Sequence, residues 1–212
     1  MQKLSFTQKY YLCSLTKRGG FSNLVWLLTG GIAELLVLGY IQRAEKDKLV
    51  RAKPWDGGPP YLKPINDKIE TSNKPLTAVQ HIDTFNSRLS EELVNAYKVS
   101  LLESGCADEI PCNKPKKKIR IKPKPEALKE IVNNLRSEML SDEELFVDTI
   151  LLATLLDASG KIGNYFSRFE RNDLKKRLKE VRDSGHGAMI RDVLAHFNDV
   201  SVIITTTTVP QV

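Results

Sequence analysis

The chain has 212 residues, of which 41% are hydrophobic and 27% are charged. Both fractions are close to globular averages, so they exclude a largely disordered chain and a protein built from many membrane-spanning helices. Lys and Arg number 32 against 26 Asp and Glu, a formal charge of +6. This excess favours an anionic partner, either a lipid headgroup surface or a nucleic acid. The length fits one sizeable domain over residues 1–212.

Cysteine usage and the N-terminal residues bear on the compartment. Cys13, Cys106 and Cys112 are odd in number and form no CxxC pair, which suits a reducing environment. The start, MQKLSFTQKYYLCSL, lacks the long apolar run and the small-residue cleavage site of a secretory signal. We therefore expect a cytoplasmic protein, with peripheral attachment to the inner membrane face left open.

The first third of the chain predicts two helices and a hairpin. Ser5 and Gln8 have capping-box spacing, which predicts a helix over 6–17 that Gly19-Gly20 ends. Ser22 is the expected N-cap of a second helix over 23–39, which is apolar on nearly every side. Loop formers and a charged turn then predict a wing and loop over 40–66.

The rest of the chain alternates helices with one basic hairpin. Helical spacing predicts a helix over 76–105, ended by Gly105, and alternating Lys, Pro and β-branched residues predict a hairpin over 106–124. A helix over 126–139 follows, and a capping box at Ser141 is expected to open the next, apolar helix. The segments NDLKKRLKEVRDSG and AMIRDVLAHF predict two more helices, and the tail 199–212 predicts a strand or an extended arm. The fold class is therefore mainly α, a compact helical bundle with one or two small β-hairpins.

The stretch FSNLVWLLTGGIAELLVLGYI, residues 21–41, allows three interpretations. A membrane span would place Glu34 near the bilayer centre, which costs about 2.5 to 3.5 kcal/mol. A winged-helix recognition element would need polar side chains in its first turns, where this segment has LVWLL. The third interpretation, a central core helix, explains both the all-round apolarity and Gly30-Gly31, and we favour it. It requires a buried partner for the carboxylate.

The order LSFTQKYYLCSLTKRG, LTGGIAELLVLGYI and a polar hairpin resembles the N-terminal signature of the Golgi phosphoprotein 3 family, particularly its bacterial members. The later segments LLESGCADE, KIRIKPKPEALKEIVNNLRSEML and SDEELFVDTILLATLLDASG are similar to that family's helices and hairpin. The resemblance implies a helical domain that binds anionic membrane lipid, phosphatidylinositol 4-phosphate in eukaryotic members, and that gathers protein partners.

The resemblance also implies a headgroup site. The family uses a Trp between the first two helices, an Arg in the second helix and an Arg pair before the hairpin. These positions fall here on Gly19-Gly20, on Leu28, and near Glu91 and Val94, so the headgroup residues are not matched.

Seven basic residues and one Trp form the candidate lipid-binding site. A polybasic element near an anionic membrane gains about 1 kcal/mol per Lys or Arg. The candidates are Lys17, Arg18, Trp26, Lys116, Lys117, Lys118, Arg120 and Lys122. An ordinary basic loop and a solvated edge strand protected by Lys and Pro are the alternatives.

Enzymatic chemistry has little support in the sequence. His81, His186 and His196 show no paired spacing, and there is no P-loop or GxGxxG. Asp148 and Asp157 lie in an apolar helix, where carboxylates more often form ion pairs than act as acid and base. We expect no enzyme, no metal and no cofactor.

The sequence therefore predicts a peripheral, adaptor-like protein that binds anionic lipid. A soluble helical protein-interaction module is one alternative, and a winged-helix-like nucleic-acid binder is another, which the apolar second helix argues against. A protein partner and oligomerisation through the 106–124 hairpin stay open.

Overall fold

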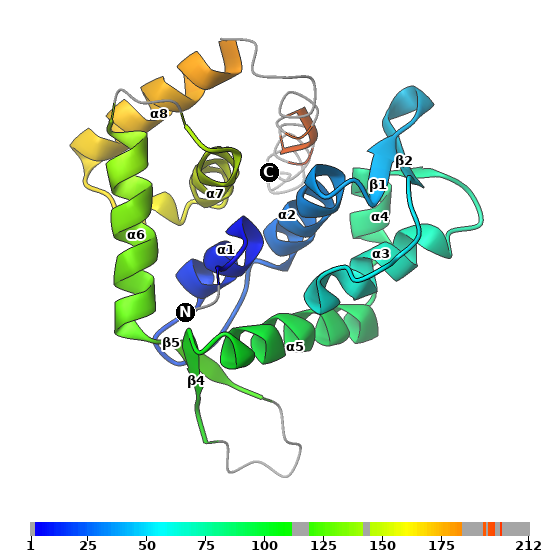
Figure 1. Cartoon of the computed structure of the whole chain (residues 1–212), viewed down its shortest axis with the longest axis horizontal. Coiled ribbons are helices and arrows are strands. Elements are labelled where there is room, and N and C mark those ends of the chain that lie inside the picture. Colours follow the sequence, from blue (N-terminus) through cyan, green and yellow to red (C-terminus); the bar gives the residue numbers. More distant parts are fainter. Residues whose placement is uncertain are drawn as a thin grey trace, which may run out of the picture.

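The computed structural model describes residues 3–111, 119–141, 145–183, 193, 195–197 and 200. It is mainly α-helical with two small antiparallel sheets, so the predicted fold class is confirmed (Figure 1). Its α-helices are α1 (Phe6–Ser14), α2 (Leu24–Val37), α3 (Lys63–Glu70), α4 (Ala78–Asp83), α5 (Ser87–Glu103), α6 (Pro125–Met139), α7 (Val147–Ala158) and α8 (Arg168–Asp183). One core cluster runs from the N-terminal segment to the last described residue.

The first helix begins as predicted but ends earlier. The Ser5 hydroxyl accepts from the Gln8 backbone N–H, and the Gln8 side chain accepts from the Ser5 N–H, so the capping box is present. A turn closed by hydrogen bonds between Thr16 and Gly20 then stops α1 at Ser14, three residues before the expected end. The expected Ser22 cap is wrong, because Asn23 occupies the N-cap position of α2 and its side chain makes no capping bond.

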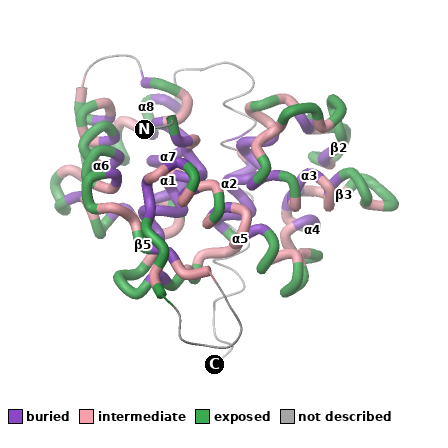
Figure 2. The backbone as a smooth tube through the Cα atoms, turned by 60° about the horizontal axis from the view of Figure 1, so that its bottom comes forward, coloured by how far each residue is buried: buried purple, intermediate pink, exposed green. Residues whose placement is uncertain are grey.

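Helix α2 is the central helix of the fold. Every residue from Trp26 to Leu35 is buried, and α1, α3, α4 and α7 all contact the helix. Figure 2 shows this burial, while many residues of α6 are exposed. The core-helix interpretation of 21–41 is therefore confirmed. Within the described residues, no helix has both the length and the apolarity that crossing a membrane requires.

The predicted wing is present, but the loop after it is partly helical. β1 (Ile41–Arg43) pairs antiparallel with β2 (Lys48–Arg51), and β3 (Leu76–Thr77) adds to the other edge of β2. The 40–66 prediction missed a 3-10 turn at Pro60–Leu62 and the start of α3. Proline near the first position of each helix explains the error, because it reads as a loop former in sequence and yet fits a helix N-terminus.

The predicted single helix over 76–105 is wrong, because the structure holds β3 and two helices there. Thr77 and Gln80 form a capping box that opens α4, and Asn86 caps α5 by accepting from the Leu89 N–H. Side chains that cap a helix favour a break in the chain direction over a continuous helix. Gly105, with φ +72, follows the end of α5 as expected.

The second half largely follows the prediction. β4 (Ala107–Glu109) pairs antiparallel with β5 (Ile121–Pro123), and α6 begins at Pro125. The expected helix start at Ser141 is wrong: α7 begins at Val147, with Phe146 at the N-cap position, and residues 142–144 lie outside the description. Most of NDLKKRLKEVRDSG lies in α8, whereas the segment 188–197 is described only in part and the tail from 201 not at all.

Candidate functional site

Two segments far apart in sequence meet at one end of the molecule. The loop between α1 and α2 lies against β5, where the Arg120 guanidinium donates a hydrogen bond to the carbonyl of Arg18. The two strands of the hairpin are held by the β4–β5 pairing and by a bond from the Ile110 N–H to the Arg120 carbonyl, 2.7 Å long. In Figure 1 this hairpin projects beyond α5 and α6. The fold thereby brings Lys17 and Arg18 beside the hairpin.

Gly19 makes this contact close. Its φ of +71 lies in the left-handed region, and a Cβ there would run into the backbone carbonyl of Ile121 and lie 2.9 Å from the Ile110 side chain. Only glycine permits both the turn and the close approach of the two backbones. Gly19, expected only as part of a helix stop, therefore also docks the loop onto the hairpin.

Positive charge dominates the exposed surface of this end, with a smaller acidic contribution. Lys17, Arg18 and Lys122 are exposed, and Arg120 is half-buried. Among the described residues no carboxylate pairs with any of these four. Asp108 lies opposite Lys122 on β4 and forms a long ion pair of 3.9 Å with Lys124, so part of the hairpin charge is neutralised. We call Lys17, Arg18, Arg120 and Lys122 the basic end.

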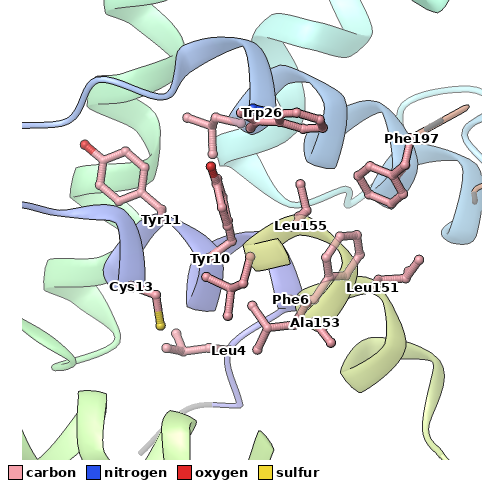
Figure 3. Close-up of a cluster of buried hydrophobic side chains, with 14 of the residues drawn as sticks. Leu4, Phe6, Tyr10, Tyr11, Cys13, Trp26, Leu151, Ala153, Leu155 and Phe197 are labelled. Carbon is pink, nitrogen blue, oxygen red and sulfur yellow. The ribbon is translucent and has the colours of Figure 1, made fainter. Parts of the chain in front are cut away.

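The other predicted candidates are placed differently. Lys116, Lys117 and Lys118 lie outside the described residues, as does Lys114. Trp26 is 9% exposed and packs in the core with Tyr10 of α1 and Leu155 of α7, away from solvent (Figure 3). Its indole therefore belongs to the fold and is not part of the basic end.

The buried Glu34 finds hydroxyl partners in place of a cation. Its carboxylate is 4% exposed and accepts hydrogen bonds from Thr7, from Ser5 at 3.0 Å and from Tyr61 at 2.7 Å. Tyr97 donates in turn to the Thr7 hydroxyl at 3.0 Å. The three hydroxyls that donate to the carboxylate come from the start of α1 and from the 3-10 turn before α3, and Tyr97 of α5 joins through Thr7. The network therefore connects α2 with three other parts of the chain. The sequence predicted the need for a partner and missed these hydroxyls.

Burial controls the titration of this carboxyl. Desolvation raises the pKa of Glu34 above its ordinary value of 4.5, and the three hydroxyl donors oppose that rise without cancelling it. The negative charge of nearby Asp148 adds to it. A raised pKa in a cleft can mark catalysis, but Glu34 is enclosed by structural contacts on all these elements, so we assign it to stability.

Two histidines are buried without a catalytic arrangement. Desolvation lowers the pKa of His81 and of His196 to about 4, so both are neutral at pH 7. Nε2 of His196 lies 3.0 Å from the Thr29 carbonyl, which fixes the ring against α2. Within the described ranges, no three His, Cys, Asp or Glu side chains gather in a way that could hold a metal ion.

Comparison with known proteins assigns no family to the chain. No protein-family model matches the chain, and a search of curated proteins finds no match either.

Changing Gly19 to Ala tests the contact between the loop and the hairpin. We expect a loss of about 1 to 3 kcal/mol in unfolding free energy from the strained backbone, and more from the clash with Ile121. Gly57→Ala is a matched control, because Gly57 has φ +64 and nothing within 4 Å of its Cβ direction. Urea denaturation of both variants isolates the contact, and equal losses would show that the close approach adds nothing.

Proposed function

We propose that the protein is a peripheral membrane protein that binds anionic lipid through its basic end. The observation that carries the proposal is the docking of the Lys17-Arg18 loop against β5, which gathers cations from positions about a hundred residues apart. Cations held on a rigid backbone bind a charged surface without first ordering a loop. The resemblance to the Golgi phosphoprotein 3 family supports the same proposal, and we extend that family assignment to this chain as part of it.

The expected binding energy is moderate and depends on salt. At about 1 kcal/mol per Lys or Arg near an anionic surface, the four residues of the basic end contribute at most about 4 kcal/mol, and the exposed carboxylates of Asp108 and Glu109 on β4 reduce that value. Four further lysines lie in the sequence between β4 and β5, at positions 114 and 116–118. Because exposed charges are screened beyond about 10 Å at 0.1 M salt, the attachment should be reversible and should weaken as salt rises.

We propose that the protein recognises the negative charge of the lipid surface and does not select a specific headgroup. Leu28, which stands where the resemblance implies an Arg, is 2% exposed and lies in the core. Glu91, near the implied Arg pair, is an exposed acid on α5. A pocket selective for phosphatidylinositol 4-phosphate would need cations at these places, so we expect phosphatidylglycerol to bind about as well at equal charge.

Co-sedimentation with liposomes tests the proposal. We expect binding to phosphatidylglycerol liposomes at low salt, none to neutral liposomes, and a large loss when Lys17, Arg18 and Lys122 are all changed to Ala. The control triple variant changes Arg168, Lys176 and Lys179, three exposed cations of α8, which lies at the opposite end of the molecule from the hairpin (Figures 1 and 2). The control removes the same charge and should still bind.

The same experiment decides against the proposal in two ways. Equal losses in both triple variants would mean that net charge alone drives sedimentation. No binding of the unchanged protein to any liposome at low salt would leave the protein-interaction module as the better function. Including Lys116, Lys117 and Lys118 in a further Ala variant measures what the residues between the strands contribute.

A further inference from the structure

A groove of about 700 Å³ runs between the N-terminal segment, α6 and the start of α7. Its α6 wall extends from Ala127 to Glu138, about 16 Å at 1.5 Å per residue. Its floor is made of buried apolar side chains: Leu4, Cys106, Ala127, Ile131, Leu135 and Leu152. The volume is in the range of pockets that hold small molecules, and an apolar floor of this length suits a single hydrocarbon chain.

The rim of the groove carries both signs of charge on different walls. Lys3 and Lys9 come from the N-terminal segment and α1, and Glu130, Glu138 and Asp148 come from α6 and α7. In the described part of the chain none of these five forms an ion pair, and only Glu138 has a side-chain partner, the Thr149 hydroxyl. Opposite charges that face one apolar floor and do not pair with each other are complementary to a ligand that carries both signs.

An exposed aromatic ring stands at the mouth. Phe146 is 71% exposed, although it lines the groove and directly precedes α7. An aromatic face beside carboxylates attracts a quaternary or primary ammonium, at about 0.5 to 1 kcal/mol for exposed rings. With Asp148 two residues further on, this wall provides a site for a cation, and the two lysines provide one for an anion.

We propose that this groove binds a zwitterionic single-chain lipid of the phosphocholine or phosphoethanolamine class. The hydrocarbon chain lies on the floor along α6, the phosphate faces Lys3 and Lys9, and the ammonium faces Phe146 and the carboxylates. This site is separate from the basic end and takes a different headgroup charge. A short apolar peptide with free ends shares this chemistry, and the experiment below separates the two.

Isothermal titration calorimetry on the full chain tests the inference, with dodecylphosphocholine below its micelle concentration as the probe. We expect one site per chain, with affinity at least tenfold higher than for dodecyl maltoside, dodecanoate or dodecyltrimethylammonium. Glu130→Lys should shift the preference toward dodecanoate, because it leaves three cations against two carboxylates on the rim. Lys3→Glu should shift it toward dodecyltrimethylammonium, because it leaves one cation against four carboxylates. Phe146→Ala should weaken dodecylphosphocholine about threefold. All three residues are exposed, so folding should be unaffected.

Two controls keep the outcomes distinct. Asp83→Lys reverses an exposed charge on α4, on the other side of the molecule from α6, and should change nothing (Figure 1). Lys17→Ala with Arg18→Ala should also leave this binding intact while weakening liposome attachment. The proposal is overturned if the four ligands bind alike, if Glu130→Lys and Asp83→Lys have the same effect, if trileucine binds and dodecylphosphocholine does not, or if nothing binds.

Discussion

Replacing Glu34 with Ala should destabilise the protein by about 3 kcal/mol, since the Thr7 and Tyr61 hydroxyls lose a buried acceptor and a cavity opens beside α2. Glu34→Gln keeps an acceptor oxygen in the same place and should cost about 1 kcal/mol. Glu103→Ala, on the exposed end of α5, is the control and should stay within about 0.5 kcal/mol of the unchanged protein. Urea titrations of the three variants give these differences. An Ala variant as stable as the control would contradict a structural role for the carboxylate.

The same carboxyl should make stability depend on pH. Because the folded pKa of Glu34 is raised above 4.5, the folded state holds this proton more tightly than the unfolded state does. The contribution is fully present below pH 4.5 and is lost as pH rises through the raised pKa. Glu34→Gln cannot titrate, so the stability of the unchanged protein relative to that of this variant should fall over the same range.

Comparing the two proteins at each pH cancels the other titrating groups. His81 and His196 have pKa values lowered from 6.5 to about 4. The stability they contribute therefore grows as pH rises from about 4 and is complete above 6.5, in the unchanged protein and in Glu34→Gln alike. Measuring unfolding free energy from pH 4 to 8 therefore isolates Glu34. A difference that does not change with pH would show that the carboxyl has the same pKa in the folded and unfolded states.

Gly31→Leu should destabilise the protein by about 3 kcal/mol, because it overpacks the contact between α2 and α3. A Cβ at this position would meet the Cδ1 atom of Ile65 on α3, and it would lie 3.5 Å from Leu62 and 3.6 Å from the Tyr97 hydroxyl. No open space exists for a longer side chain, so α3 must move away from α2. This displacement of α3 weakens its packing on α2, so the melting temperature should fall while the overall fold is kept.

A double-mutant cycle tests that explanation. Gly31→Ala adds only the Cβ, and Ile65→Val removes the Cδ1 atom that it would meet. If the clash is the cause, the double variant should be more stable than the sum of the two single changes predicts. Strict additivity would show that the loss comes from elsewhere, since a Gly-to-Ala change inside a helix by itself favours the helix by about 1 kcal/mol.

Helix boundaries could be predicted from the sequence where a few neighbouring residues determine them. The Ser5–Gln8 capping box and Gly105 each act within a few residues, so their pattern can be read directly. The same kind of signal misled at Ser141, where α7 begins six residues later. The Thr77–Gln80 capping box and the Asn86 cap that divide 76–105 are equally local, but the helical spacing around them favoured a single continuous helix.

The candidate sites were harder to predict from the sequence than the helices. Lys17, Arg18, Arg120 and Lys122 could be chosen from charge alone, but Trp26 could not be excluded until the structure placed it in the core. The groove along α6 has no sequence signature, because its walls come from the N-terminal segment, α6 and α7.

The sequence by itself determined that this chain is mainly helical, that its second helix is buried all round, and that the carboxylate within that helix needs a partner. These follow from composition, from periodicity and from the free energy of burying a charge. Only the tertiary structure decided which hydroxyls meet Glu34, that the Gly19 turn docks on Ile121, and which charges surround the groove. The physical reason is that such contacts join residues tens of positions apart, and their distances depend on how whole helices pack.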